Sequence, residues 1–182
     1  MSKTKDRLDI LDKAEKLISQ AETLIPKILE PDLPPAKISD KDISGNPAWH
    51  DFEHKIWSTG EELRALIQKN PALRKDAKLF QRILNIAKNR NAKRGRQSFI
   101  MLLASKQFSN FAADLVTQLD DKFVDGQVIC AIQKMRVSGF ENEIKPFTEN
   151  EHAWIRNAAK KYLTQKNETL YEEGFNKFCL FR

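Results

Sequence analysis

The sequence predicts an all-α fold, and three observations support this prediction. Apolar residues recur at helical intervals along most of the chain, and only 6 of its 182 residues are glycine. No segment has the alternation of apolar and polar residues that is typical of a half-buried strand. Hydrophobic residues make up 41% of the chain, so we expect one domain with a buried core, or one domain with an appended segment.

The first predicted element is a helix over residues 4–29. Ile10, Leu17 and Leu24 widen its heptad seam into a broad apolar face. A face of this width favours docking on a core or groove over a two-stranded coiled coil. We expect Pro26 to kink or loosen the last turn. The seam itself comprises Leu11, Ala14, Ile18, Ala21, Ile25 and Ile28.

Residues 30–47 contain four prolines and one glycine and lack helical periodicity. Such a segment is typical of a loop, and here it would tether the first helix to the rest of the protein. The predicted organisation is therefore an amphipathic helix over 1–29, a linker over 30–47 and a helical domain over 48–182.

From residue 48 onward the periodicity predicts one helix after another. Pro71 is expected at the first position of a short helix, with Asn70 as its N-cap. In the last predicted helix, Trp154, Ile155, Ala159 and Leu163 are expected to be buried. That helix lies within residues 151–163, and the other predicted helices lie within residues 49–67, 79–87, 97–104, 108–119, 124–135 and 139–147.

The second half of the chain contains an internal repeat. Phe108 aligns with Phe140 at an offset of 32 residues, and Ala131 aligns with Ala159 at an offset of 28. Periods near 30 with two helices per unit are typical of α-solenoids.

One copy of this repeat carries a family resemblance. The segment EHAWIRNAAKKYL resembles the first-helix pattern of HEAT-like repeats, and the resemblance covers residues 92–166. It implies a right-handed stack of helices that binds a macromolecule, commonly a protein and sometimes nucleic acid. It does not imply catalysis.

Positive charge is concentrated in one segment. Residues 61–105 contain 11 Lys or Arg and 3 Asp or Glu, a net charge of +8, whereas residues 1–60 contain 9 and 11. Within that segment lies KNRNAKRGRQ, residues 88–97, which has five basic residues and no acid. We expect its second half to fall on the first turn of the next helix, where the helix dipole disfavours cations. Residues placed against a local preference often belong to a functional surface.

The predicted binding surface follows from this charge. An acidic protein is the expected partner. Nucleic acid is the alternative, although no exposed aromatic residues are evident among the basic ones, as a single-strand binder would require. A further possibility is that the cations pair internally with the acid-rich residues 1–60. The predicted binding residues are Lys93, Arg94, Arg96, Arg90, Lys88, Arg82 and Lys78.

The segment HDFEH, residues 50–54, matches the H-x-x-E-H pattern of the inverzincin metallopeptidases. In that interpretation His50 and His54 share one helical face and bind zinc, Glu53 acts as base, and His152 or a carboxylate completes the site. In the other interpretation the histidines flank the apolar side of an ordinary helix. Because such short patterns recur by chance, we expect no metal, no cofactor and no catalytic residue.

Cysteine usage and hydropathy bear on the compartment. Cys130 and Cys179 form no CxxC pair, and Cys130 lies in an apolar run, which indicates a buried thiol in a reducing compartment. The charged N-terminus lacks a signal sequence, and the longest apolar run, 99–104, is too short to cross a bilayer. We therefore expect a cytoplasmic protein that does not bind membranes.

The apolar tail, residues 170–182, is expected either to cap the end of the stack or to enter a groove of a partner. The predicted function is non-catalytic binding of a macromolecule, as in an adaptor or an inhibitor of the immunity-protein type. The alternative is a helical-repeat protein that binds DNA or RNA, and the third possibility is a zinc hydrolase that uses HDFEH.

Overall fold

The computed structural model describes the backbone of residues 2–28 and 49–178, and the side chains of residues 7–28 and 49–165. Within these ranges the chain is helical and contains no strand, which confirms the predicted all-α fold. No helix in the described ranges is both long enough and apolar enough to span a membrane. The predicted linker 30–47 and the side chains of the tail 170–182 lie outside the described residues.

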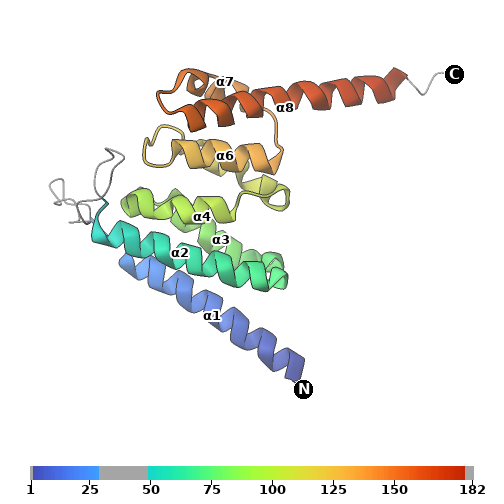
Figure 1. Cartoon of the computed structure of the whole chain (residues 1–182). Helices are drawn as coiled ribbons and strands as arrows, with labels where there is room; N and C mark the ends of the chain where they lie inside the picture. The colour runs from blue at the N-terminus through green and yellow to red at the C-terminus, as the bar shows by residue number, and fades with distance from the viewer. Residues whose placement is uncertain (1, 29–48, 179–182) are drawn as a thin grey trace. The chain divides into compact units, whose positions relative to one another are not determined.

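The chain divides into two compact units, Met1–Leu103 and Ala104–Arg182. The predicted division at the linker, with a helical domain over 48–182, stays a prediction. In the first unit α1 packs against α2 and α3, and α2 also contacts α4 and η2 (Figure 1). The first unit contains α1 (Ser2–Leu24), α2 (Asp51–Lys69), the 3-10 helix η1 (Pro71–Lys75), α3 (Ala77–Lys88), the 3-10 helix η2 (Arg90–Arg96) and α4 (Gln97–Leu102).

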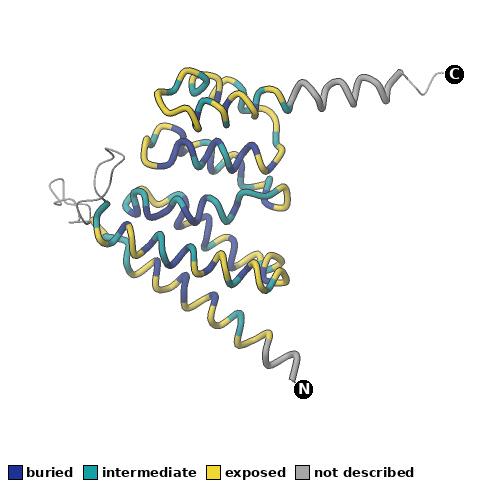
Figure 2. The backbone as a smooth tube through the Cα atoms, viewed as in Figure 1, coloured by how far each residue is buried: buried dark blue, intermediate teal, exposed yellow. Residues whose placement is uncertain are grey.

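The helix α1 confirms most of the predicted apolar seam. Ala14, Ile18 and Ala21 are fully buried, and α1 packs against α2 and α3. Figure 2 shows that buried positions alternate with exposed ones along this helix. The helix ends at Leu24 rather than at residue 29, because a proline at 26 disfavours helical geometry at the residue before it. Ile28 is consequently 82% exposed and does not extend the seam.

The turn between α2 and α3 forms as predicted, with Pro71 opening η1 directly after Asn70. The side chain of Asn70 does not cap η1 but donates to the carbonyl of Leu66 at 2.9 Å, at the end of α2. Asp76 caps α3, since its carboxylate accepts the backbone N–H of Leu79 at 2.9 Å. The apolar face predicted for this helix is buried: Leu79, Phe80, Ile83, Leu84 and Ala87.

The second unit consists of two successive helical hairpins. In each, a short segment of 3-10 and α-helix precedes a longer helix, and the two longer helices, α6 and α8, pack together. The aligned residues Ala131 and Ala159 are both fully buried. The two aligned stretches of sequence therefore lie in successive hairpins, and the repeat itself stays a prediction. Their elements are η3 (Lys106–Phe111), α5 (Ala112–Val116), α6 (Asp125–Met135), α7 (Glu141–Ile144), η4 (Lys145–Glu149) and α8 (Ala153–Phe178).

The burial predicted for α8 holds in part. Ile155 and Ala159 are buried, but Trp154 is 49% exposed, so the prediction for this residue is wrong. Its indole covers Gly126 of α6, where a Cβ atom would lie 2.0 Å from the ring. Leu163 is half-buried, and Tyr162 is buried beside it. Compared with the prediction, the buried face of α8 is therefore shifted around the helix, away from Trp154 and toward Tyr162.

We predict that Ala159→Glu unfolds the second unit. The Cβ of Ala159 is fully enclosed between α8 and its neighbours, and a carboxylate buried there without a partner costs several kcal/mol. Urea unfolding followed by circular dichroism measures the loss. Lys160→Glu, at the exposed neighbouring position, is the matched control and should unfold like the wild type. An unchanged midpoint for Ala159→Glu would show that this packing is wrong.

Candidate binding site

The carboxylate of Glu53 is the centre of the polar structure in the first unit. This side chain lies in the first turn of α2 and is fully buried. Its Oε2 atom accepts the backbone N–H of His50 at 2.6 Å, which is half of a capping box. Its Oε1 atom accepts the backbone N–H of Arg94 at 3.0 Å. One carboxylate therefore joins the start of α2 to a segment about 40 residues later.

The basic segment 88–97 folds back onto α2 through this carboxylate. Arg94 places its Nε atom 3.5 Å from Oε1 of Glu53 and its guanidinium carbon 5.2 Å from the ring centroid of Trp49. Gly95 permits the approach, since a Cβ atom there would lie 2.8 Å from the carbonyl oxygen of Glu53 and from Ile56. Most of the segment thus belongs to η2, which packs on α2.

The expectation that Lys93, Arg94 and Arg96 form an exposed first helical turn is wrong. They lie in η2, and α4 begins only at Gln97. Arg96 is fully buried, and its Nη1 atom donates to the carbonyl of Ala87 at 3.0 Å. That carbonyl is in the last turn of α3, where helical partners are missing. The side chain of Arg94 is 11% exposed. Both arginines are therefore structural.

Lys93 is held in a strained conformation. Its φ of 44° and ψ of −128° lie in a region that glycine adopts freely and that costs other residues roughly 1–3 kcal/mol. Its Nζ atom lies 3.2 Å from Nε2 of His50. The strain allows η2 to turn so that the next residue, Arg94, reaches Glu53.

The remaining predicted binding residues differ in their surroundings. Arg82 forms an ion pair with Glu22 of α1 at 2.6 Å, and this hydrogen-bonded carboxylate raises the pKa of Arg82. Lys78 and Arg90 are exposed, and Lys88 is half-buried. Arg82 and Arg94 therefore show the internal pairing with the acid-rich residues 1–60 that the sequence left open.

The geometry of HDFEH differs from that of a zinc motif. His50 is the N-cap of α2 and has an extended backbone, with φ −70° and ψ 148°, so it does not share a helical face with His54. The ring of His50 stacks on Phe52 with centroids 5.5 Å apart. The carboxylate of Glu53 accepts the backbone N–H groups of His50 and Arg94. Among the residues that the structure describes, no three His, Cys, Asp or Glu side chains form a group that could hold a metal ion.

Two titratable groups of the second unit have shifted pKa values. Burial raises the pKa of Asp125, whose carboxylate accepts the N–H of Gly126 at 2.6 Å at the start of α6. Burial also raises the pKa of Cys130, which is half-buried rather than buried as predicted. The raised pKa disfavours the reactive thiolate. Neither group has a geometry that points to catalysis.

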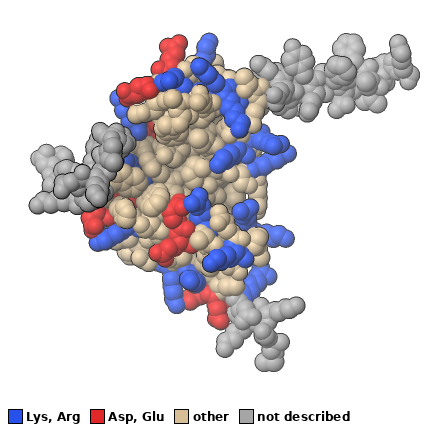
Figure 3. Space-filling view, viewed as in Figure 1, with Lys and Arg blue, Asp and Glu red and all other residues tan. Residues whose placement is uncertain are grey.

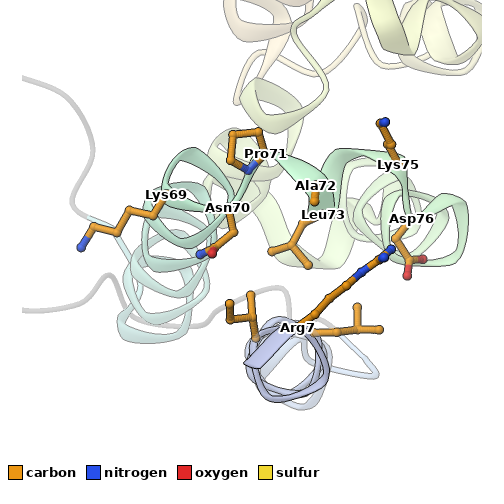
Figure 4. Close-up of a pocket in the computed structure, with 10 residues that line it drawn as sticks. Arg7, Lys69, Asn70, Pro71, Ala72, Leu73, Lys75 and Asp76 are labelled. Atoms are coloured by element: carbon orange, nitrogen blue, oxygen red, sulfur yellow. The ribbon is translucent and has the colours of Figure 1, made fainter. Parts of the chain in front are cut away.

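A pocket that the sequence analysis missed lies between α1, the end of α2 and η1 (Figure 4). Its volume is about 530 Å³, within the range of roughly 300–1,000 Å³ that is common for ligand sites. It forms because the proline after α2 turns the chain into η1 beside the docked helix α1. It is lined by Arg7, Ile10, Leu11, Lys69, Asn70, Pro71, Ala72, Leu73, Lys75 and Asp76.

The walls of this pocket are basic and its floor is aliphatic. Arg7, Lys69 and Lys75, which we call the basic rim, come from α1, α2 and η1. In Figure 4 Arg7 extends toward Asp76, while the two lysines point outward on different sides. Within the described part of the chain, neither lysine forms an ion pair, and both are exposed. The basic rim therefore outnumbers the one acidic residue of the pocket.

Sequence reasoning missed the pocket because its residues come from two distant stretches of the chain, 7–11 and 69–76, which only the docking of α1 brings together. Only the run PALRK, with a proline between two predicted helices and two basic residues, gave a local signal. Arg7 lies in a segment without excess positive charge, and its role depends on how α1 docks.

Comparison with known proteins identifies no relative of this chain. No protein-family model, no curated protein and no solved structure matches it. The resemblance of residues 92–166 to HEAT-like repeats therefore stays a prediction.

We predict that the triple variant Lys93→Gln/Arg94→Gln/Arg96→Gln is less stable than the wild type by about 3 kcal/mol or more. It removes the cation beside the buried carboxylate of Glu53 and the donor to the carbonyl of Ala87. The dipole argument from sequence alone gives the opposite sign.

Urea unfolding measures this difference, with Lys78→Gln as the control at an exposed basic position. The control should change the free energy of unfolding by no more than about 0.5 kcal/mol. A triple variant as stable as the wild type would show that these three cations do not contribute to folding and lie on the surface.

Proposed function

We propose that this protein is a non-catalytic binding protein that docks an acidic protein partner on its first unit. The observation that carries the proposal is the basic rim: three cations surround an aliphatic pocket that contains one acidic residue. Figure 3 shows that Lys and Arg side chains project from the visible face of the first unit, with Asp and Glu side chains between them. The excess of positive charge is therefore a property of the pocket residues and not of the whole face. An acidic surface would be attracted to this end of the molecule and oriented there.

The chemistry of the pocket favours protein over nucleic acid. Its apolar residues are aliphatic, namely Ile10, Leu11, Pro71, Ala72 and Leu73. Bases bind best to aromatic platforms, and the pocket has none. The carboxylate of Asp76 also opposes a continuous phosphate backbone. Aliphatic walls next to cations instead match a protein surface that carries both carboxylates and apolar side chains.

The wider proposal keeps the architecture and role predicted from the sequence. It retains the right-handed HEAT-like stack as a proposal, for which the successive hairpins of the second unit and the packing of α6 on α8 are the supporting observations. Proteins of this kind commonly bind other proteins. An adaptor or an immunity-type inhibitor in the cytoplasm fits such a protein. The binding residues are now the basic rim together with exposed Lys78 and Arg90, and not the buried Arg96.

We predict that reversing the rim charges weakens binding of a glutamate-rich peptide. Fluorescence anisotropy compares the wild type with Arg7→Glu/Lys69→Glu/Lys75→Glu. Affinity should fall at least about tenfold, and binding to the wild type should weaken as salt is added.

The matched control is Lys122→Glu/Lys134→Glu/Lys160→Glu, which changes the net charge equally at exposed positions of the second unit. It should bind the peptide nearly as the wild type does. The proposal fails if both triple variants lose affinity equally, or if an oligonucleotide binds more tightly than the peptide and ignores the rim reversal.

A further inference from the structure

We propose that the pocket receives one or two aliphatic or phenylalanine side chains of the partner, presented by a short peptide segment in which carboxylates flank them. The inference rests on the proposed function, since it names the segment of the acidic partner that the basic rim recognises. The occupant is thus an acidic segment with an apolar centre, not an acidic surface in general.

The apolar part of this inference comes from incomplete burial. Leu73 forms the buried floor, but Ile10 and Leu11 are only half-buried, and Ala72 is exposed. Apolar surface also continues beyond the pocket, because Leu8, one turn before Leu11 on α1, is 62% exposed. A contiguous apolar surface of this kind, bordered by polar groups, is typical of an interaction site. Covering it with an apolar side chain removes it from water.

The volume of the pocket limits the size of the occupant. About 530 Å³ is more than a single small side chain fills and less than a folded element needs. One or two large side chains, held by a few residues of extended or helical peptide, fit this space. Recognition by such anchors in a groove is a common mode of peptide binding.

The carboxylates of the occupant follow from the rim. Lys69 and Lys75 extend from different sides of the pocket in Figure 4, so acidic groups on both sides of an apolar anchor can reach a lysine each. Asp76 already accepts the N–H of Leu79 and would repel a carboxylate placed next to it. The acidic groups of the peptide are therefore directed to the lysines and away from the start of α3.

The test uses two short acidic peptides that differ only at one central residue, leucine in one and serine in the other. The leucine peptide should bind the wild-type protein at least about tenfold more tightly than the serine peptide, as expected for a buried anchor. Ala72→Trp fills the pocket without changing its charge. In this variant the leucine peptide should bind only as tightly as the serine peptide, whose affinity stays unchanged.

Ala113→Trp is the matched control, because Ala113 is an exposed alanine of the second unit. It should keep the full preference for leucine. Methyl NMR of the wild-type protein gives a test that does not depend on whether the variants fold. The leucine peptide should shift the methyl signals of Leu11 and Leu73, and the serine peptide should not.

The outcomes separate this inference from the proposed function. If the two peptides bind equally but both are lost on rim reversal, the pocket is not an anchor site and the docking function stands. If rim reversal leaves both affinities unchanged, the proposed function itself is overturned. The inference is also overturned if Ala72→Trp keeps the preference for the leucine peptide. It is overturned as well if the leucine peptide shifts only methyl signals of residues outside the pocket.

Discussion

A buried carboxylate without partners is costly, and the first unit is organised around satisfying one. Glu53 accepts one backbone N–H from the residue that caps its own helix and another from η2. Arg94 adds a cation at its edge. Hydrogen bonds to a charged acceptor are stronger than neutral ones and offset its desolvation. The docking of η2 on α2 depends on this single group.

Several unusual local features follow from that docking. Lys93 takes up a backbone conformation suited to glycine, Gly95 lets two backbones touch, and Arg96 is buried against the end of α3. Each costs free energy or restricts the residue type locally, and each is needed for η2 to reach Glu53. Arg94 and Arg96 therefore serve the fold, and the exposed cations that we propose for a partner are the basic rim together with Lys78 and Arg90.

Much of the fold could be predicted from the sequence, because helical periodicity and proline positions are local signals. The buried face of α3 and the start of η1 at Pro71 were found in this way. The sequence did not predict which basic side chains point inward. Their orientation depends on Glu53, which is about 40 residues from Arg94 in the chain. A local rule about helix dipoles was applied to residues that are not in an α-helix. The exposure of Trp154 likewise depends on a distant contact, Gly126.

Amide hydrogen exchange at Arg94 tests most directly whether Glu53 holds η2 in place. Our account predicts that this amide exchanges about as slowly as that of Leu63 in the middle of α2, because its N–H is bonded to a fully buried carboxylate. In Glu53→Ala the protection of Arg94 should fall far more than that of Leu63. An Arg94 amide that exchanges as fast as an exposed peptide group in the wild type would contradict the account.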